Sequence, residues 1–86
     1  MTVEYIRYRI AAGQQPAFLE AIRLANQLLA TANDCLSYQL AHCEEDTELF
    51  IWRIEWTSVE QHLNGFRKST EFGTFFHLVK PFYTNI

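Results

Sequence analysis

The residue with the clearest capacity for chemistry is His62, which lies in the stretch EWTSVEQHLNGFRKSTEF at positions 55–72. An imidazole with a pKa of about 6.5 can accept the proton of a phenol near neutral pH. Trp56 precedes this histidine and Phe66 follows it, and both rings could stack on an aromatic ligand. His62 is therefore the candidate catalytic base, and a partly buried structural histidine is the alternative interpretation.

The other candidate site residues are aromatic and share one face of the expected strands and helices. Tyr8 or Tyr38 could hydrogen-bond a substrate oxygen, and the other rings could orient an aromatic compound. The predicted pocket residues are Ile6, Tyr8, Tyr38, Trp52, Trp56, His62, Phe66, Phe72 and Phe76. A stripe of this kind is also typical of a hydrophobic core, so both interpretations stay open at this point.

Metal and cofactor binding have no recognisable pattern in this sequence. His42, His62 and His77 are not spaced as i, i+4 pairs, and none has a cysteine or carboxylate in a ligand pattern. The chain has no glycine-rich phosphate loop and no nucleophile elbow. We therefore expect no metal and no cofactor, and an oxygenase would have to work without a prosthetic group.

Alternating side chains predict the strands that position these residues. The predicted strands are residues 3–10, 35–43 and 48–56. In the first strand Ile6, Tyr8 and Ile10 share a face. In the second, Leu36, Tyr38, Leu40 and His42 share a face. The strongest strand signal is the third, in which Phe50, Trp52, Ile54 and Trp56 share a face.

Apolar residues spaced by three and four predict an amphipathic helix over residues 16–31. Ser58 can cap a short helix through Phe66, and Thr70 can begin a second helical piece that Pro81 ends. The last residues, FYTNI, are predicted to form a further strand. The order is then strand, helix, strand, strand, helix, strand, which is the ferredoxin-like βαββαβ arrangement of an α+β protein with an antiparallel sheet.

The second face of such a sheet is left without helices, and here it is not uniformly polar. The predicted dimer face holds Tyr5, Arg7, Arg9, Ile51, Arg53 and Glu55. A half-apolar open face favours sheet-to-sheet dimerisation. The charged residues on it are expected to cluster, either as a charge network in the interface or, alternatively, as a carboxylate-binding site.

Length and composition set the remaining expectations. The 86 residues suffice for one domain, over 1–86, and 49% of them are hydrophobic, which again favours a homodimer. A net charge of -3 gives no basic face for nucleic acid. No apolar run approaches the roughly 18 residues of a membrane span, and no signal peptide opens the chain. Cys35 and Cys43 are too far apart on one strand to form a disulfide. We therefore expect a cytoplasmic protein with reduced cysteines.

The order of elements and several stretches together resemble the antibiotic biosynthesis monooxygenase (ABM) family of small dimeric α+β barrel proteins. These stretches are the first strand ending in AAG, the RIEW strand, the WTSVE step into the helix, and STEFGTFF. The resemblance implies a homodimer whose sheets close into a barrel, with a pocket between sheet and helices in each subunit. It also implies a possible cofactor-free oxygenase of the quinol monooxygenase type, because members of the family include such enzymes as well as haem-degrading ones.

One position departs from the family pattern. Relatives commonly carry a histidine three residues before the S-x-x-F element, where Phe66 stands here, and another where Glu71 stands. His62 lies one helical turn before Phe66 and could reach the same cavity. The haem-degrading branch uses an asparagine near the position of Ile6, so haem degradation is disfavoured. Two hypotheses follow: a cofactor-independent monooxygenase acting on a small aromatic or quinol-like compound, or a non-enzymatic dimeric binding or accessory protein of the same fold.

Overall fold

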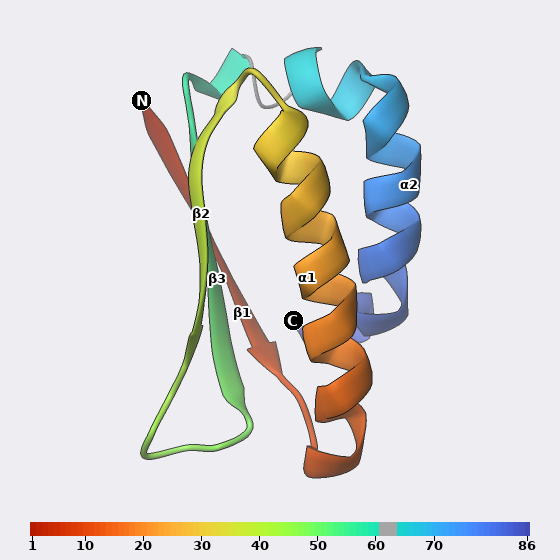
Figure 1. Ribbon diagram of the computed structural model, residues 1–86. Helices are drawn as coiled ribbons and strands as arrows, with labels where there is room; N and C mark the ends of the chain where they lie inside the picture. Colours follow the sequence, from red (N-terminus) through yellow and green to blue (C-terminus); the bar gives the residue numbers. More distant parts are fainter. Residues whose placement is uncertain (61–63) are drawn as a thin grey trace.

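The structure is a computed structural model that describes residues 1–60 and 64–86 (Figure 1). Its strands are β1 (Thr2–Arg9), β2 (Cys35–His42) and β3 (Leu49–Trp56). Its helices are α1 (Gln15–Thr31) and α2 (Thr70–Val79), with 3₁₀-helices η1 (Ala12–Gln14), η3 (Phe66–Lys68) and η4 (Lys80–Asn85). The helix predicted from Ser58 is present at residues 59–60 and its centre, with His62, lies outside the described residues.

The strands form an antiparallel sheet in the order β1-β3-β2, so β3 is the central strand. Helices α1 and α2 lie next to each other on one side of this sheet (Figure 1). Because β3 is paired on both sides and covered on one face, every second residue of it is buried. The α+β class, the antiparallel sheet and the ferredoxin-like arrangement predicted from the sequence are thereby confirmed.

The predicted last strand is wrong, because residues 82–86 do not join the sheet. Lys80–Asn85 forms η4, with Pro81 in its first turn, where the missing N–H of proline has no cost and its fixed φ favours a helix. Phe82 is only 8% exposed and packs edge-on against Phe18, with ring centroids 5.3 Å apart. Asn85 donates a hydrogen bond to the carbonyl of Arg9 at 3.1 Å. The end of the chain is therefore held by a buried ring and a side-chain bond.

The second strand differs from its predicted alternation at one residue. The register shifts between Cys35, which pairs with Trp56, and Ser37, which pairs with Glu55, and this irregularity leaves Leu36 54% exposed. Leu36 therefore does not share the core face, and Cys35 packs against the core in its place. Both cysteines are free, as predicted, and burial raises the pKa of the Cys35 thiol, which disfavours the reactive thiolate.

The core lies between the sheet and α1. This helix buries Phe18, Ala21, Ile22, Ala25 and Leu29 against the strands. The Phe18 ring contacts both Tyr8 and Phe50, at centroid distances of 4.9 and 5.1 Å. Helix α2 behaves differently, since none of its residues is fully buried.

The other face of the sheet carries no helix in the described part of the chain (Figure 1). On it the Arg53 guanidinium lies 3.4 Å from both Glu55 and the Ser37 hydroxyl. Arg9 does not join this group, because it pairs with Asp46 at 2.8 Å and Glu48 at 3.5 Å in the turn between β2 and β3. The predicted charge cluster is therefore divided in two. No helix within residues 1–60 and 64–86 has both the length and the apolar character to cross a membrane.

Candidate functional site

A cavity of about 280 Å³ lies between the sheet and α2, on the same face of the sheet that α1 covers. One wall is β1, through Glu4, Ile6 and Tyr8. The floor is β3, through Trp52, Ile54 and Trp56. The opposite wall is mainly phenylalanine, from Phe66 and from Phe72, Phe75 and Phe76 of α2. The fold thus builds an aromatic cavity from one edge strand, the central strand and the second helix.

Most of the predicted pocket residues meet in this cavity. The ones that line it are Ile6, Tyr8, Trp52, Trp56, Phe66, Phe72 and Phe76. Tyr38 does not line it, because β2 lies at the opposite edge of the sheet from β1, and its ring stays 38% exposed there. The predicted base His62 lies outside the described residues, so its role stays a prediction.

Glu4 is a charged residue among the cavity residues that the sequence reasoning missed. It alternates with Ile6 and Tyr8 along β1 and pairs in register with Ile54, so its side chain is on the covered face. The Trp56 indole Nε1 donates a hydrogen bond to Glu4 Oε1 at 3.3 Å. The signal was the period-two alternation itself, which extends from Tyr8 through Ile6 to Glu4. A carboxylate is usually assigned to solvent, and the predicted face therefore stopped at Ile6.

Tyr8 supplies a second polar group to the same wall. Its side chain is 3% exposed. Burial, and secondly the negative charge of Glu4, raise the pKa of Tyr8 to about 12. The phenol is therefore protonated across the physiological pH range and can donate a hydrogen bond to a ligand oxygen.

The two tryptophans of the floor are held by hydrogen bonds at their N–H groups. Trp52 Nε1 donates to the Asn26 side-chain oxygen of α1 at 3.0 Å, as Trp56 does to Glu4. The Trp52 ring also stacks on Phe75 of α2, with 5.6 Å between centroids and 25° between planes. Both indoles are therefore fixed at their polar edge in the floor of the cavity, where each is only 1% exposed.

Phe66 is the packed centre of the aromatic wall. It is 3% exposed, lies 5.3 Å from Trp56, and meets Phe72 and Phe75 edge-on at 5.7 and 5.0 Å. Arg67, the next residue, is exposed and places its guanidinium carbon 5.7 Å from the centre of the Phe72 ring. A buried ring and an exposed cation therefore follow each other at this end of the cavity.

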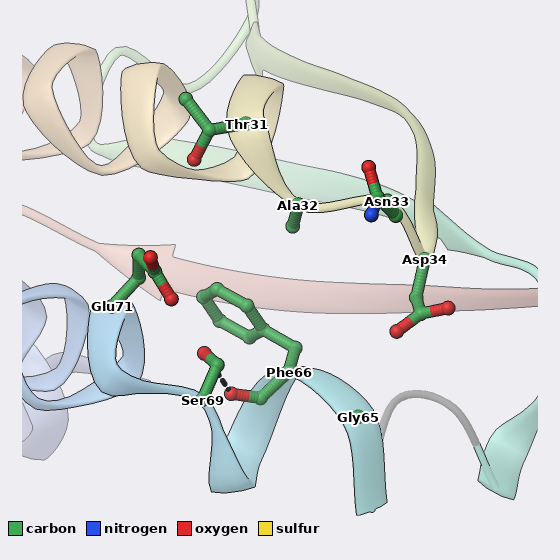
Figure 2. A pocket seen from close by; sticks show the side chains of 8 residues that line it. All are labelled: Thr31, Ala32, Asn33, Asp34, Gly65, Phe66, Ser69 and Glu71. Atoms are coloured by element: carbon green, nitrogen blue, oxygen red, sulfur yellow. Dashed lines mark hydrogen bonds between the residues drawn. The ribbon is translucent and has the colours of Figure 1, made fainter.

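A second cavity, of about 260 Å³, lies between the end of α1 and the start of α2 (Figure 2). Phe66 lines both cavities and separates them. The hydroxyls around the second cavity are bonded to backbone carbonyls, from Ser69 to Phe66 at 2.6 Å and from Thr31 to Leu28 at 2.7 Å. Its remaining polar groups include the carboxylates of Asp34 and Glu71, which alone do not define a ligand.

His42 does not line the cavity, and the described part of the chain holds no cluster of metal-ligating side chains. The His42 ring stacks on Phe50 at 4.1 Å and its Nε2 lies 2.7 Å from the carbonyl of Thr47, so it supports the turn between β2 and β3. Across residues 1–60 and 64–86, no three His, Cys, Asp or Glu side chains are grouped to hold a metal ion. The expectation of a protein without metal or cofactor stays a prediction.

The sequence matches the model of a known family, antibiotic biosynthesis monooxygenase, over residues 1–78. This protein belongs to the ABM family. A Bacillus subtilis (strain 168) relative, the uncharacterized protein YczJ, is 30% identical over 84 residues, which cover 98% of this chain and 88% of the relative.

Two solved structures share the fold of this ABM protein. A crystal structure from Bordetella bronchiseptica, provisionally assigned as an antibiotic biosynthesis monooxygenase, has a TM-score of 0.78 at 22% identity, over 93% of this chain and 82% of that one. A protein from Nitrosomonas europaea with the same provisional assignment has a TM-score of 0.77 at 13% identity. The match covers 95% of this chain and 85% of that one. At these identities the likeness shows the fold.

Proposed function

We propose that this ABM protein is a monooxygenase that acts without a bound cofactor on a small aromatic, quinol-like compound. Membership of the family supports the monooxygenase class of reaction. The observation that carries the substrate class is the cavity of about 280 Å³ under α2, which is lined mainly by aromatic and aliphatic side chains with a few polar groups, Glu4 and Tyr8 on β1 among them. A flat ring with one or two hydroxyl groups suits such a lining.

The chemistry follows from what these residues offer. Loss of a phenolic proton makes a hydroquinone electron-rich enough to react with dioxygen directly. One hydroquinone and one dioxygen then give one hydroxyquinone and one water, so the substrate itself supplies all four electrons. The tryptophan rings would orient the substrate and the protonated Tyr8 would donate to its oxygen, while the sequence predicts His62 as the proton acceptor.

We further propose that the working form is a cytoplasmic homodimer joined through the open sheet face. Tyr5 is 65% exposed there, and Arg7, Ile51, Arg53 and Glu55 are on the same face as it in the β1–β3 register. Each subunit keeps its own cavity on the opposite face. Light scattering should give twice the 10.1 kDa of the chain, and Ile51→Asp should give the monomer mass. A wild-type monomer at micromolar concentration would contradict this arrangement.

A dimeric binding or accessory protein is the second candidate function, and Phe66 is the observation that favours it. This ring, 3% exposed, occupies the position at which the family commonly carries a histidine. A cavity closed by a packed ring at that position retains affinity for an aromatic compound without the corresponding proton acceptor.

Oxygen uptake distinguishes the two functions. The protein, treated with a chelator, is mixed with a panel of hydroquinones and anthrones in an oxygen electrode, alongside His62→Ala. We expect consumption of one dioxygen per substrate by the wild type. Uptake that survives His62→Ala unchanged removes that residue as the base, and saturable binding with no uptake on any panel member favours the binding protein.

A further inference from the structure

We infer that Phe66 sets the depth of the aromatic cavity between the sheet and α2, and thereby the size of its ligand. The ligand is then a compound of one or two fused rings, such as a hydroquinone or a naphthohydroquinone, and not one with three rings in line, such as an anthrone. The size limit requires only that the cavity binds an aromatic compound, whereas its effect on turnover rests on the proposed function.

Phe66 stands between two cavities of similar volume. Among residues 1–60 and 64–86 it alone lines both the aromatic cavity, of about 280 Å³, and the second cavity, of about 260 Å³. Figure 2 shows its ring among the side chains that line the second cavity. A ligand that extends from the aromatic cavity toward the end of α1 therefore meets this ring.

The Phe66 ring is held in place by its packing and by its backbone. It meets Phe72 and Phe75 edge-on, at 5.7 and 5.0 Å between centroids, an arrangement that stabilises aromatic pairs beyond the area they bury. Its carbonyl accepts two hydrogen bonds from Ser69, from the hydroxyl at 2.6 Å and from the backbone N–H at 3.0 Å. These contacts favour one position of the side chain, so Phe66 acts as a fixed partition.

Extension in the other direction brings a ligand out of the cavity. The 3₁₀-helix η3, with Phe66, precedes α2 and η4 follows it, so the two lie at opposite ends of this helix (Figure 1). At the η4 end the cavity is lined by Phe76, Tyr83 and Ile86, and all three side chains are exposed. A ring placed beyond them stays in water and adds little binding free energy.

The volume of the aromatic cavity then limits how many rings are buried. An apolar cavity of about 150 Å³ holds one benzene molecule, so about 280 Å³ provides room for two fused rings. A third ring in line with them gains burial only by passing Phe66 into the second cavity. The lining of the second cavity includes Asp34, Ser69 and Glu71, so a hydroxyl at the far end of a longer ligand suits that space.

Three linear diols that differ by one ring measure this depth in the wild type. They are hydroquinone, naphthalene-2,6-diol and anthracene-2,6-diol, and their binding is measured anaerobically by calorimetry. The second ring should tighten binding by about 10-fold, because it is buried, and the third ring by less than about 2-fold. Equal gains from the second and third rings, or no binding of any diol, would overturn the inference.

Shorter side chains at position 66 should remove the limit. In Phe66→Ala the third ring should tighten binding by about 10-fold, and in Phe66→Leu, which preserves more of the packing, by about 3-fold. The matched variant Phe76→Ala removes a ring that lines the aromatic cavity and not the second one, and its gain from the third ring should stay below about 2-fold. Denaturation curves show which variants are folded. No gain in a folded Phe66 variant, or the same gain in Phe76→Ala, would show that Phe66 does not set the depth.

Oxygen uptake separates this inference from the proposed function. The ratio of kcat/KM for an anthrone to that for a naphthohydroquinone should rise by at least about 3-fold in Phe66→Leu relative to the wild type. Uptake with an unchanged ratio leaves the monooxygenase and removes the role of Phe66 in its specificity. The predicted series of affinities without oxygen uptake on any substrate leaves the size limit and removes the monooxygenase.

Discussion

The two helices cover the same face of one sheet, yet they pack against it in different ways. Helix α1 presents Ala21 and Ala25 between larger residues, so its backbone comes close to the strands and the core is filled. Helix α2 presents Phe72, Phe75 and Phe76, whose rings stack on one another at 5.9 to 6.1 Å and which stay partly exposed. The cavity lies between these rings and the sheet.

This difference divides the molecule into a half with a filled core and a half that contains the cavity. Both helices have the same three-and-four periodicity, so the distinction comes from side-chain size and not from the pattern. Substitutions under α1 should act on unfolding, and substitutions under α2 should act on binding.

The largest effect should come from Phe18→Ala. This ring is fully buried and contacts Tyr8, Phe50 and Phe82, so its removal should lower the free energy of unfolding by about 3 to 5 kcal/mol. The matched variant Phe76→Ala, at a ring that is 43% exposed, should cost less than about 1 kcal/mol. Urea denaturation measures both, and equal costs would remove the division between the two halves.

Tyr8 lies between the two halves, because its ring contacts Phe18 under α1 and also lines the cavity under α2. It should give the next largest effect, which is a loss of folding stability at alkaline pH. Its folded pKa of about 12 is above the value of 10.0 expected for an exposed tyrosine. The neutral phenol therefore stabilises the fold below pH 10, and roughly 2 to 3 kcal/mol is lost as pH rises from about 10 to 12. Tyr8→Phe should flatten this loss relative to wild type in denaturation curves across that range. An identical slope in both proteins would show that Tyr8 titrates normally.

Trp52 joins the two halves, because Asn26 of α1 bonds its N–H and Phe75 of α2 stacks on its ring. Asn26→Ala leaves that N–H without its partner and should lower the free energy of unfolding by about 1 to 2 kcal/mol. The exposed neighbour Gln27→Ala should stay within about 0.5 kcal/mol of wild type. If both variants unfold alike in urea, the hydrogen bond does not link the helix to the site.

The sequence predicts the α1 half better than the α2 half. Period-two alternation in β1 and β3 and helical spacing from Phe18 to Leu29 are strong, so these elements and half of the cavity residues could be named in advance. Periodicity gives the face on which a residue lies but not how closely two layers pack, so the cavity between α2 and the sheet was not predictable from it. Tyr38 was assigned to the pocket because strand alternation does not show over which edge of the sheet a helix lies.

Three local departures have their own causes. Leu36 does not lie on the core face as predicted, because the register irregularity between Cys35 and Ser37 changes which residues of β2 face the core. The final residues formed η4 because Pro81 suits the first turn of a helix and Phe82 finds a place in the core. Glu4 was missed because a glutamate is usually expected to face solvent. Its place in the alternation of β1, in register with Ile54, puts its side chain on the covered face instead.

The most direct test of the central claim is oxygen uptake by a variant whose cavity is filled. Val79 lines the cavity at the end of α2 and is half-buried, so Val79→Trp should occupy the space while the α1 core remains intact. With a hydroquinone that the wild type oxidises, we predict one dioxygen consumed per substrate by the wild type and a rate near background for folded Val79→Trp. Undiminished uptake by that variant would place the reaction elsewhere, and no uptake by the wild type on any hydroquinone or anthrone would contradict the proposed function.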